Sequence, residues 1–311
     1  MTNTSSLSKL RSYATLVAFS HTVFALPFAA SAVVLSLKEP HLELTVTRAA
    51  LMVVCMVMAR TSAMAFNRWA DRDIDDKNPR TKSRPIQSGA VRAGEALVLA
   101  LVTGALFIGA ASLLGRLPAL LAAPVLAVLL GYSYAKRFTW AAHAWLGVAL
   151  ALAPGGAWIA MGAQPGAGVL WLMLAVVTWL LGFDVLYSLQ DEAFDRKEGL
   201  HSIPVRFGVT GALALSAVSH LVTVLALAMV GVALGRGAAF FVAVFGVGAL
   251  LAWEHAIVGK GNLARIDKAF FDINAYVSVT FFALVVVDEL MRRGLLRVTG
   301  ALLHALPEVN S

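Results

Sequence analysis

This chain has few charged residues and a single cysteine. Of its 311 residues, 14% are Asp, Glu, Lys or Arg and 59% are hydrophobic, whereas roughly 25% of an ordinary soluble domain is charged. The shortage of charge excludes a soluble globular domain, and the composition predicts a protein that crosses a membrane several times. The single cysteine, Cys55, excludes an intrachain disulfide, and its apolar surroundings predict that it packs in the core.

Long apolar segments predict an all-α fold, a membrane bundle formed by residues 1–311 as one domain. Each membrane span needs about 20 apolar residues. The third and fourth segments are separated only by residues 115–118, so a count of eight spans stays open beside a count of nine. The nine transmembrane helices that we expect lie near residues 14–37, 47–69, 92–113, 117–135, 141–162, 166–189, 208–233, 235–257 and 270–291.

Lysine and arginine are distributed unevenly along the chain. Most of them fall in alternate connections, above all around residues 60–92, and the positive-inside rule places these connections in the cytoplasm. Arg292, Arg293 and Arg297 disagree, because they would follow the ninth helix on the outside. The net charge of +7 is therefore largely a signal of topology. It supports a lipid bilayer as the surroundings, gives no support for nucleic acid binding, and indicates no particular protein partner.

Acidic residues are scarce, and they concentrate in two clusters. Only 18 residues are Asp or Glu, and each cluster closes a long apolar segment. Carboxylates in such places are costly unless they bind something. Residues four apart lie on one face of a helix, so each cluster presents a stripe of oxygen-bearing side chains on the side predicted to be cytoplasmic. The first stripe is Asn67, Asp71 and Asp75, and the second is Tyr187, Asp191 and Asp195.

Two facing stripes of oxygen ligands favour a site for hard cations. Mg²⁺ prefers oxygen donors, takes only one or two carboxylates, and completes its shell with water and phosphate oxygens. The clusters could therefore hold roughly two or three Mg²⁺ ions and, through them, a diphosphate. Basic side chains nearby would neutralise the remaining charge. The candidates are Arg60, two helical turns before Asn67, and Lys136 and Arg137, at the end of the fourth span.

These motifs resemble those of a known family, the UbiA superfamily of intramembrane prenyltransferases, and the resemblance extends over nearly the whole chain. It implies a bundle of nine transmembrane helices around a central cavity, in agreement with the count of apolar segments. The stretches that carry the resemblance are Asn67-x3-Asp71-x3-Asp75, Tyr132-x3-Lys136-Arg137-x-Thr139, Tyr187-x3-Asp191-x3-Asp195 and residues 199–208.

Within the superfamily the chain resembles the 4-hydroxybenzoate polyprenyltransferase branch. Residues 21–28, 65–75 and 200–204 look like its bacterial members in the futalosine route to menaquinone. The resemblance implies Mg²⁺-dependent transfer of a polyprenyl group from a polyprenyl diphosphate to the ring of an aromatic acid. That acid would be 4-hydroxybenzoate or a related dihydroxynaphthoate, in the biosynthesis of ubiquinone or menaquinone. The protein would lie in a bacterial-type cytoplasmic (inner) membrane with its active site toward the cytoplasm.

The same resemblance assigns expected roles to individual residues. Asp71 and Asp191 are expected to be catalytic, and Arg60, Lys136 and Arg137 to stabilise charge on the leaving diphosphate. The expected metal ligands are Asn67, Asp71, Asp75, Asp191 and Asp195.

Four further residues are candidates to contact or support the acceptor. Asp184 lies seven residues before Asp191, on the same helical face and deeper in the membrane. It could position an acceptor hydroxyl or pair with a basic side chain, for which Arg60 is a suitable partner. The other three candidates are Tyr187, His21 and His201.

Two alternatives stay open. One is prenyl transfer to a different acceptor, of the haem, chlorophyll or lipid type. The other is a cation-coupled transporter, because acids that face an intramembrane cavity also mark ion pathways. Transporters tend to place ion sites near the midplane on broken helices, whereas these clusters lie at helix ends beside arginine-rich loops. The positions therefore favour an enzyme.

Overall fold

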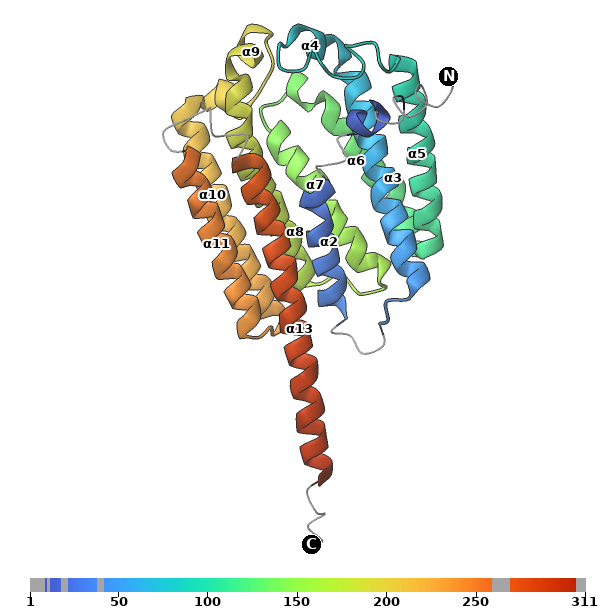
Figure 1. Ribbon diagram of the computed structural model, residues 1–311, viewed down its shortest axis with the longest axis vertical. Coiled ribbons are helices and arrows are strands. Elements are labelled where there is room, and N and C mark those ends of the chain that lie inside the picture. The colour runs from blue at the N-terminus through green and yellow to red at the C-terminus, as the bar shows by residue number, and fades with distance from the viewer. Residues whose placement is uncertain (1–8, 10–11, 18–21, 38–41, 259–268, 306–311) are drawn as a thin grey trace.

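The computed structural model describes the chain except for residues 1–8, 10–11, 18–21, 38–41, 259–268 and 306–311. Within the described part every regular element is a helix, as the composition predicts. Figure 1 shows the long helices side by side in a bundle, with two short helices over one end. The long helices are α2 (Thr22–Ser36), α3 (Val46–Ala70), α5 (Ala93–Leu114), α6 (Arg116–Gly131), α7 (Ala142–Ala160), α8 (Ala167–Ser188), α10 (Ile203–Leu234), α11 (Ala238–Val258) and α13 (Asn274–Ala305).

Short segments interrupt or extend the long helices at one end of the bundle. The short helix α4 (Arg72–Lys77) follows α3, and α9 (Glu192–Lys197) follows α8 after the 3-10 turn η3 (Leu189–Asp191). The 3-10 segment η2 (Tyr132–Arg137) ends α6, and a π-helical turn, η5 (Ala269–Ile273), precedes α13. The α4 and α9 segments lie at the top of Figure 1. Both acid clusters are thus carried to the same end of the bundle.

The number of membrane spans is close to the prediction. Eight helices in the described ranges are long and apolar enough to cross a membrane. The predicted ambiguity at residues 115–118 is not the cause of the difference, because α5 and α6 are separate helices. Instead α2 is short, with an apolar stretch at Ala25–Ser36, and residues 18–21 before it lie outside the description. The protein is an integral membrane helix bundle, and nine spans is an approximate count.

The start of α10 differs from the predicted start at residue 208. The helix begins at Ile203, where the Ser202 hydroxyl accepts a hydrogen bond from the Val205 backbone N–H. Pro204 suits this first turn, because its missing N–H would have no partner there. Gly208 then interrupts the helix with a φ of 70°, which an L-residue rarely adopts. The apolar run begins at this kink, so hydrophobicity alone misses the helical turn before it.

Small residues allow the central helices to approach closely. A Cβ atom at Gly147 in α7 would lie 2.6 Å from the carbonyl oxygen of Val177 in α8. Packing through small residues is typical of membrane bundles, because lipid supplies no hydrophobic drive between helices. Larger rings fill the space beside these contacts, and those of Phe28 and Trp179 have centroids 4.9 Å apart. The positions of α7 and α8 are therefore fixed by backbone contact.

A buried ion-pair cluster joins the α10–α11 turn to α13 at the end of the bundle opposite α4 and α9. The fully buried Arg236 side chain bonds Asp288 through Nε at 2.9 Å and Glu289 through Nη2 at 2.8 Å. The Gly237 backbone N–H also donates to Asp288. Arg293 reaches Glu289 from one turn further along α13. Among the described residues, Asp288 thus depends on Arg236 alone for a cation, whereas Glu289 is shared by three arginines.

We expect Arg236→Ala to lower the free energy of unfolding by about 3–5 kcal/mol, because it leaves the buried Asp288 carboxylate without a cation. Thermal unfolding in detergent, followed by circular dichroism, measures the effect. The matched control is Arg293→Ala, whose side chain is 51% exposed and whose loss should cost no more than about 1 kcal/mol. Equal shifts for the two variants would contradict this account of the cluster.

Candidate functional site

A cavity of about 180 Å³ lies at the end of the bundle that carries α4 and α9. Its wall is built from the last turns of α3 and α8 with the short segments that follow them, from η2 after α6, and from the first turn of α7. Both acidic motifs line it, together with basic side chains from two loops. The charged side chains that line the cavity are Arg68, Asp71, Asp75, Arg80, Arg84, Lys136, Arg137, Asp184, Asp191 and Asp195.

The first motif is divided between two helices. Asn67 belongs to the last turn of α3, Asp71 is the residue that ends this helix, and Asp75 lies on α4. The Asn67 side-chain amide donates to Asp71 Oδ2 at 2.9 Å, so these two ligand candidates are already aligned. Asp75 is buried, with 6% of its surface exposed. The stripe predicted from four-residue spacing is therefore present, although it does not lie on one continuous helix.

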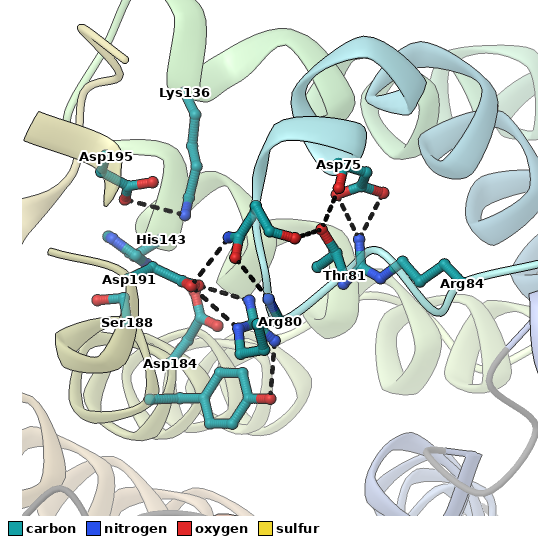
Figure 2. A network of polar contacts seen from close by, with 12 residues as sticks. Asp75, Arg80, Thr81, Arg84, Lys136, His143, Asp184, Ser188, Asp191 and Asp195 are labelled. Atoms are coloured by element: carbon teal, nitrogen blue, oxygen red, sulfur yellow. Dashed lines mark hydrogen bonds and ion pairs between the residues drawn. The ribbon is translucent and has the colours of Figure 1, made fainter. Parts of the chain in front are cut away.

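The second motif has the same construction. Tyr187 lies in the last turn of α8, Asp191 ends the 3-10 turn η3, and Asp195 lies on α9. Asp191 and Asp195 are both buried. A change of helix at the middle aspartate of each motif turns the last aspartate toward the cavity, so the two motifs face one another (Figure 2).

Each aspartate of the two motifs is paired with a basic side chain. Figure 2 shows three of these pairs. Such pairs stabilise the ionised form of a buried carboxylate, and they bring positive charge to the cavity wall. The partners are Arg137 for Asp71 at 3.4 Å, Arg84 for Asp75 at 2.6 Å, Arg80 for Asp191 at 2.5 Å and Lys136 for Asp195 at 3.3 Å.

The loop after α4 reaches across the cavity to the second motif. Arg80 Nε donates to Asp191 Oδ1 at 3.0 Å, its Nη2 reaches Oδ2, and its Nη1 donates to the Tyr187 hydroxyl at 3.2 Å. Asn78 donates to Asp191 as well. Outside the cavity, Lys77 and Glu198 join the two loops at 2.9 Å. The two motifs are thus connected through loop residues before any ligand is considered.

Electrostatics at Asp71 favours a cation. Burial raises the pKa of Asp71 above its ordinary value, and the neighbouring Asp75 carboxylate raises it further. Arg137 and Asn67 lower the pKa in opposition but do not cancel the increase. A divalent cation beside this carboxylate would reverse the effect, because it stabilises the ionised form.

The predicted basic residues are only partly brought together. Lys136 and Arg137, in η2, line the cavity and pair with Asp195 and Asp71. Arg60, in the middle of α3, does not line it. Its contact with a diphosphate therefore stays a prediction.

Only some of the residues predicted to contact the acceptor line the cavity. Tyr187 and Asp184 line the cavity. His201 does not, and its backbone N–H donates to the Lys136 carbonyl. His21 lies outside the described residues. The suggested pairing of Arg60 with Asp184 stays a prediction, and the basic partner that the structure gives Asp184 is His143, in the first turn of α7, whose Nδ1 lies 2.6 Å from Asp184 Oδ2.

Three arginines and one histidine of the wall were not found from the sequence. Arg80 and Arg84 belong to a loop whose charges the positive-inside rule already explained, and only their contacts show a second role. His143 follows the Lys136-Arg137 pair in an apolar segment, and nothing local marks it. Arg68 directly follows Asn67, and no ion pair or hydrogen bond of its side chain is found within the described residues. It is therefore a cation of the cavity wall with no bound carboxylate.

The oxygen-bearing side chains of the cavity can supply part of the ligand shell of Mg²⁺. In the described part of the chain, no group of three or more His, Cys, Asp or Glu side chains is arranged to hold a metal ion by itself. The available donors are oxygens of aspartate and asparagine, which suit Mg²⁺, and this ion normally keeps one or two carboxylates and several other oxygen ligands. The wall is thus suited to an ion that brings water or phosphate oxygens with it.

The fold and the site together define a class of protein: an integral membrane helix bundle with an acid-lined and base-lined cavity at one end. Comparison with known proteins places it more closely. The model of the UbiA prenyltransferase family matches residues 22–281. The chain belongs to this family.

Two similar proteins bear the name 4-hydroxybenzoate octaprenyltransferase. The protein from Aromatoleum aromaticum is 32% identical over 235 residues, which cover 74% of this chain and 78% of that protein. The protein from Nitrosomonas eutropha is 32% identical over 248 residues, which cover 77% and 83%.

Solved structures share the fold. A UbiA homolog from Aeropyrum pernix K1, in an apo structure, has a TM-score of 0.77 and 35% identity, covering 86% of this chain and 98% of that one. A UbiA homolog from Archaeoglobus fulgidus bound to GPP and Mg²⁺ has a TM-score of 0.65 over 88% of this chain and 99% of that one. At 21% identity, the second likeness shows the fold alone.

Proposed function

We propose that this protein transfers a polyprenyl group from a polyprenyl diphosphate to the ring of an aromatic acid, with Mg²⁺ as cofactor. One observation carries the proposal: aspartates from two facing motifs and five cationic side chains line the same cavity. A metal-bound diphosphate needs both kinds of partner. The relatives named 4-hydroxybenzoate octaprenyltransferase support the aromatic acceptor, and the GPP and Mg²⁺ of the Archaeoglobus fulgidus homolog support the donor and the metal.

Both motifs would contribute oxygen ligands to the metal. Mg²⁺, when bound, neutralises charge on the diphosphate and so makes it a better leaving group. Because one ion takes only one or two carboxylates, four aspartates suit more than one ion. The residues that would provide oxygen ligands are Asn67, Asp71, Asp75, Asp191 and Asp195.

Basic side chains would bind the phosphate oxygens. Arg80, Arg84, Lys136 and Arg137 each contact a motif aspartate. When those carboxylates turn to a metal, the same cations become available to an anion in the cavity. Within the part of the chain that the structure describes, Arg68 has no aspartate partner to leave before it can bind an anion. We therefore propose that the diphosphate contacts Arg68 before it contacts the other four cations. Cations positioned before the reaction stabilise the charge that grows on the leaving group.

The rest of the reaction follows from the chemistry of the two substrates. The allylic C–O bond breaks, and its electrons leave with the diphosphate. The ring carbon ortho to the acceptor hydroxyl forms the new C–C bond, and loss of the proton on that carbon restores the aromatic ring. The polyprenyl tail would lie among the apolar helices. We expect 4-hydroxybenzoate, or a related hydroxynaphthoate, as the acceptor in quinone biosynthesis.

Product formation tests the proposed function. Purified protein with Mg²⁺ and a polyprenyl diphosphate should prenylate 4-hydroxybenzoate or 1,4-dihydroxy-6-naphthoate and release one diphosphate per product. Comparing the two acids identifies the acceptor. Absence of product with either acid, together with Mg²⁺-dependent ion flux in liposomes, would overturn the enzyme in favour of a transporter.

We also propose that the cavity end faces the cytoplasm of a bacterial inner membrane, on the charge distribution. In a Cys55→Ser background, Ser83→Cys lies in the exposed loop after α4, and Gln164→Cys lies in the exposed loop at the other end. A membrane-impermeant maleimide should label Ser83→Cys in inverted vesicles and Gln164→Cys in right-side-out spheroplasts. The reverse pattern would show the opposite orientation.

A further inference from the structure

We propose that His143 accepts a hydrogen bond from the hydroxyl group of the aromatic acceptor and that Asp184 holds its ring for this purpose. The inference rests on the proposed function and identifies which end of the acceptor the cavity recognises. His143 lies in the first turn of α7, its side chain is 1% exposed, and it lines the cavity. Asp184 approaches it from α8, with Oδ2 2.6 Å from Nδ1 (Figure 2).

The contact with Asp184 determines which ring nitrogen carries hydrogen. A carboxylate only accepts hydrogen bonds, so a hydrogen lies on Nδ1, and in the neutral imidazole Nε2 then keeps its lone pair. His143 Nε2 is buried and has no hydrogen-bond partner among the described residues. A buried polar atom without a partner is costly. A ligand that brings a hydrogen-bond donor to Nε2 would remove this cost.

The depth of the pair suits an acceptor next to the metal site. Asp184 lies on α8, seven residues before Asp191 of the 3-10 turn η3, and both line the cavity. At helical rise this spacing places Asp184 roughly 10 Å deeper in the bundle. A diphosphate held by the motifs would direct its first prenyl carbon toward this depth. The acceptor ring would therefore lie between the motif aspartates and the Asp184–His143 pair.

The fold holds the two helices close at this point. Gly147 lies one turn after His143 on the same face of α7, and Val177 lies two turns before Asp184 on α8. The backbone contact between Gly147 and Val177 allows no Cβ atom. The short distance between His143 and Asp184 is thus supported by packing on the same faces and not only by the hydrogen bond.

The chemistry of the acceptor decides which group meets Nε2. An ionised carboxylate offers no hydrogen, whereas a phenolic hydroxyl donates one. With the hydroxyl at His143, the ortho carbon lies beside this contact and can face the prenyl group. As positive charge enters the ring, the hydroxyl hydrogen becomes more acidic, so the hydrogen bond strengthens in the transition state. Such an interaction raises kcat more than it lowers KM.

A comparison of acceptors tests the inference. 4-Hydroxybenzoate and 4-aminobenzoate have a donor at the para position, and 4-methoxybenzoate has none. We expect wild-type protein to prefer 4-hydroxybenzoate over 4-methoxybenzoate by at least about a hundredfold in kcat/KM. His143→Leu should reduce this preference to less than about tenfold, mainly by lowering kcat for the hydroxy acid. 4-Aminobenzoate should lose activity in this variant in parallel with 4-hydroxybenzoate.

Two variants separate recognition from loss of structure. His143→Gln keeps an amide oxygen that can accept a hydrogen bond and should keep more of the hydroxyl preference than His143→Leu. Asp184→Asn retains the shape of the pair but can place the hydrogen on Nε2, as in serine proteases with the same change, so the hydroxyl preference should fall although the histidine remains. Mg²⁺-dependent binding of the polyprenyl diphosphate should stay within about threefold of wild type in all three variants.

The contradicting result is equally specific. If His143→Leu lowers turnover of 4-hydroxybenzoate and 4-methoxybenzoate by the same factor, His143 only supports the packing of α7 against α8, and the inference fails. If wild-type protein prenylates no aromatic acid at all, the proposed function fails first, which is a different outcome from an unchanged preference in an active enzyme.

Discussion

Asp191→Asn should lower kcat for prenyl transfer by about a hundredfold to a thousandfold, the loss typical when one electrostatic partner of a transition state is removed. Asp191 has two roles in the proposed mechanism. It supplies an oxygen to Mg²⁺, and it holds Arg80 and Asn78 over the cavity. Asparagine keeps the shape and one oxygen but loses the charge on which both roles depend. The same substitution at Asp71, Asp75 or Asp195 should also remove most turnover.

The measurement is single-turnover product formation with saturating Mg²⁺ and donor, which separates chemistry from product release. Asp73→Asn is the matched control, because Asp73 lies inside the first motif but its side chain is 80% exposed. Its rate should stay within about threefold of wild type. Near wild-type turnover in Asp191→Asn would show that the metal site lies elsewhere.

The structure shows that loss of activity after alanine substitution of a motif aspartate can have two causes, a missing metal ligand or a less stable fold. An aspartate that only binds a metal could be removed without affecting packing. However, Asp75, Asp191 and Asp195 are buried and bound to basic partners. Alanine at any of them leaves a buried cation without its partner, which lowers stability as well as activity. Asparagine is therefore the more informative replacement.

Local patterns predicted the features that depend on neighbours in sequence. Apolar runs of about 20 residues located the long helices, and four-residue spacing grouped Asn67, Asp71 and Asp75 correctly. These patterns could not show the helix break at Asp71 or at Asp191. Such breaks are determined by contacts with other loops, in particular the bonds of Asp191 to Asn78 and Arg80.

Contacts between side chains that are far apart in the sequence could not be predicted from the sequence. Arg80 and Asp191 are 111 residues apart, and His143 and Asp184 are 41 residues apart. The arginine was already explained by its place in a loop predicted to be cytoplasmic, and the histidine is a lone polar residue in an apolar helix. Only the packing of α7 on α8, which the absence of a Cβ atom at Gly147 allows, shows that His143 meets Asp184.

The cavity wall predicts that Mg²⁺ and the diphosphate bind together. Its motif aspartates are each paired with a basic side chain, and within the described ranges no three acidic, histidine or cysteine side chains are arranged to hold an ion. A free Mg²⁺ ion would have to displace these cations without compensation. When a diphosphate arrives, it supplies oxygens to the metal and accepts the displaced cations, so each ligand offsets the cost of the other.

We therefore expect weak binding of Mg²⁺ alone and an increase in Mg²⁺ affinity of roughly a hundredfold in the presence of a non-reactive polyprenyl thiodiphosphate. By thermodynamic linkage, Mg²⁺ must raise the affinity for the thiodiphosphate by the same factor. Titration calorimetry in both orders measures the two factors, and chelation of Mg²⁺ by EDTA should abolish turnover. Arg68→Met should weaken binding of the thiodiphosphate with and without Mg²⁺ and leave the coupling factor nearly unchanged, because Arg68 holds no carboxylate. Tight binding of Mg²⁺ in the absence of a diphosphate would contradict this exchange of ion pairs.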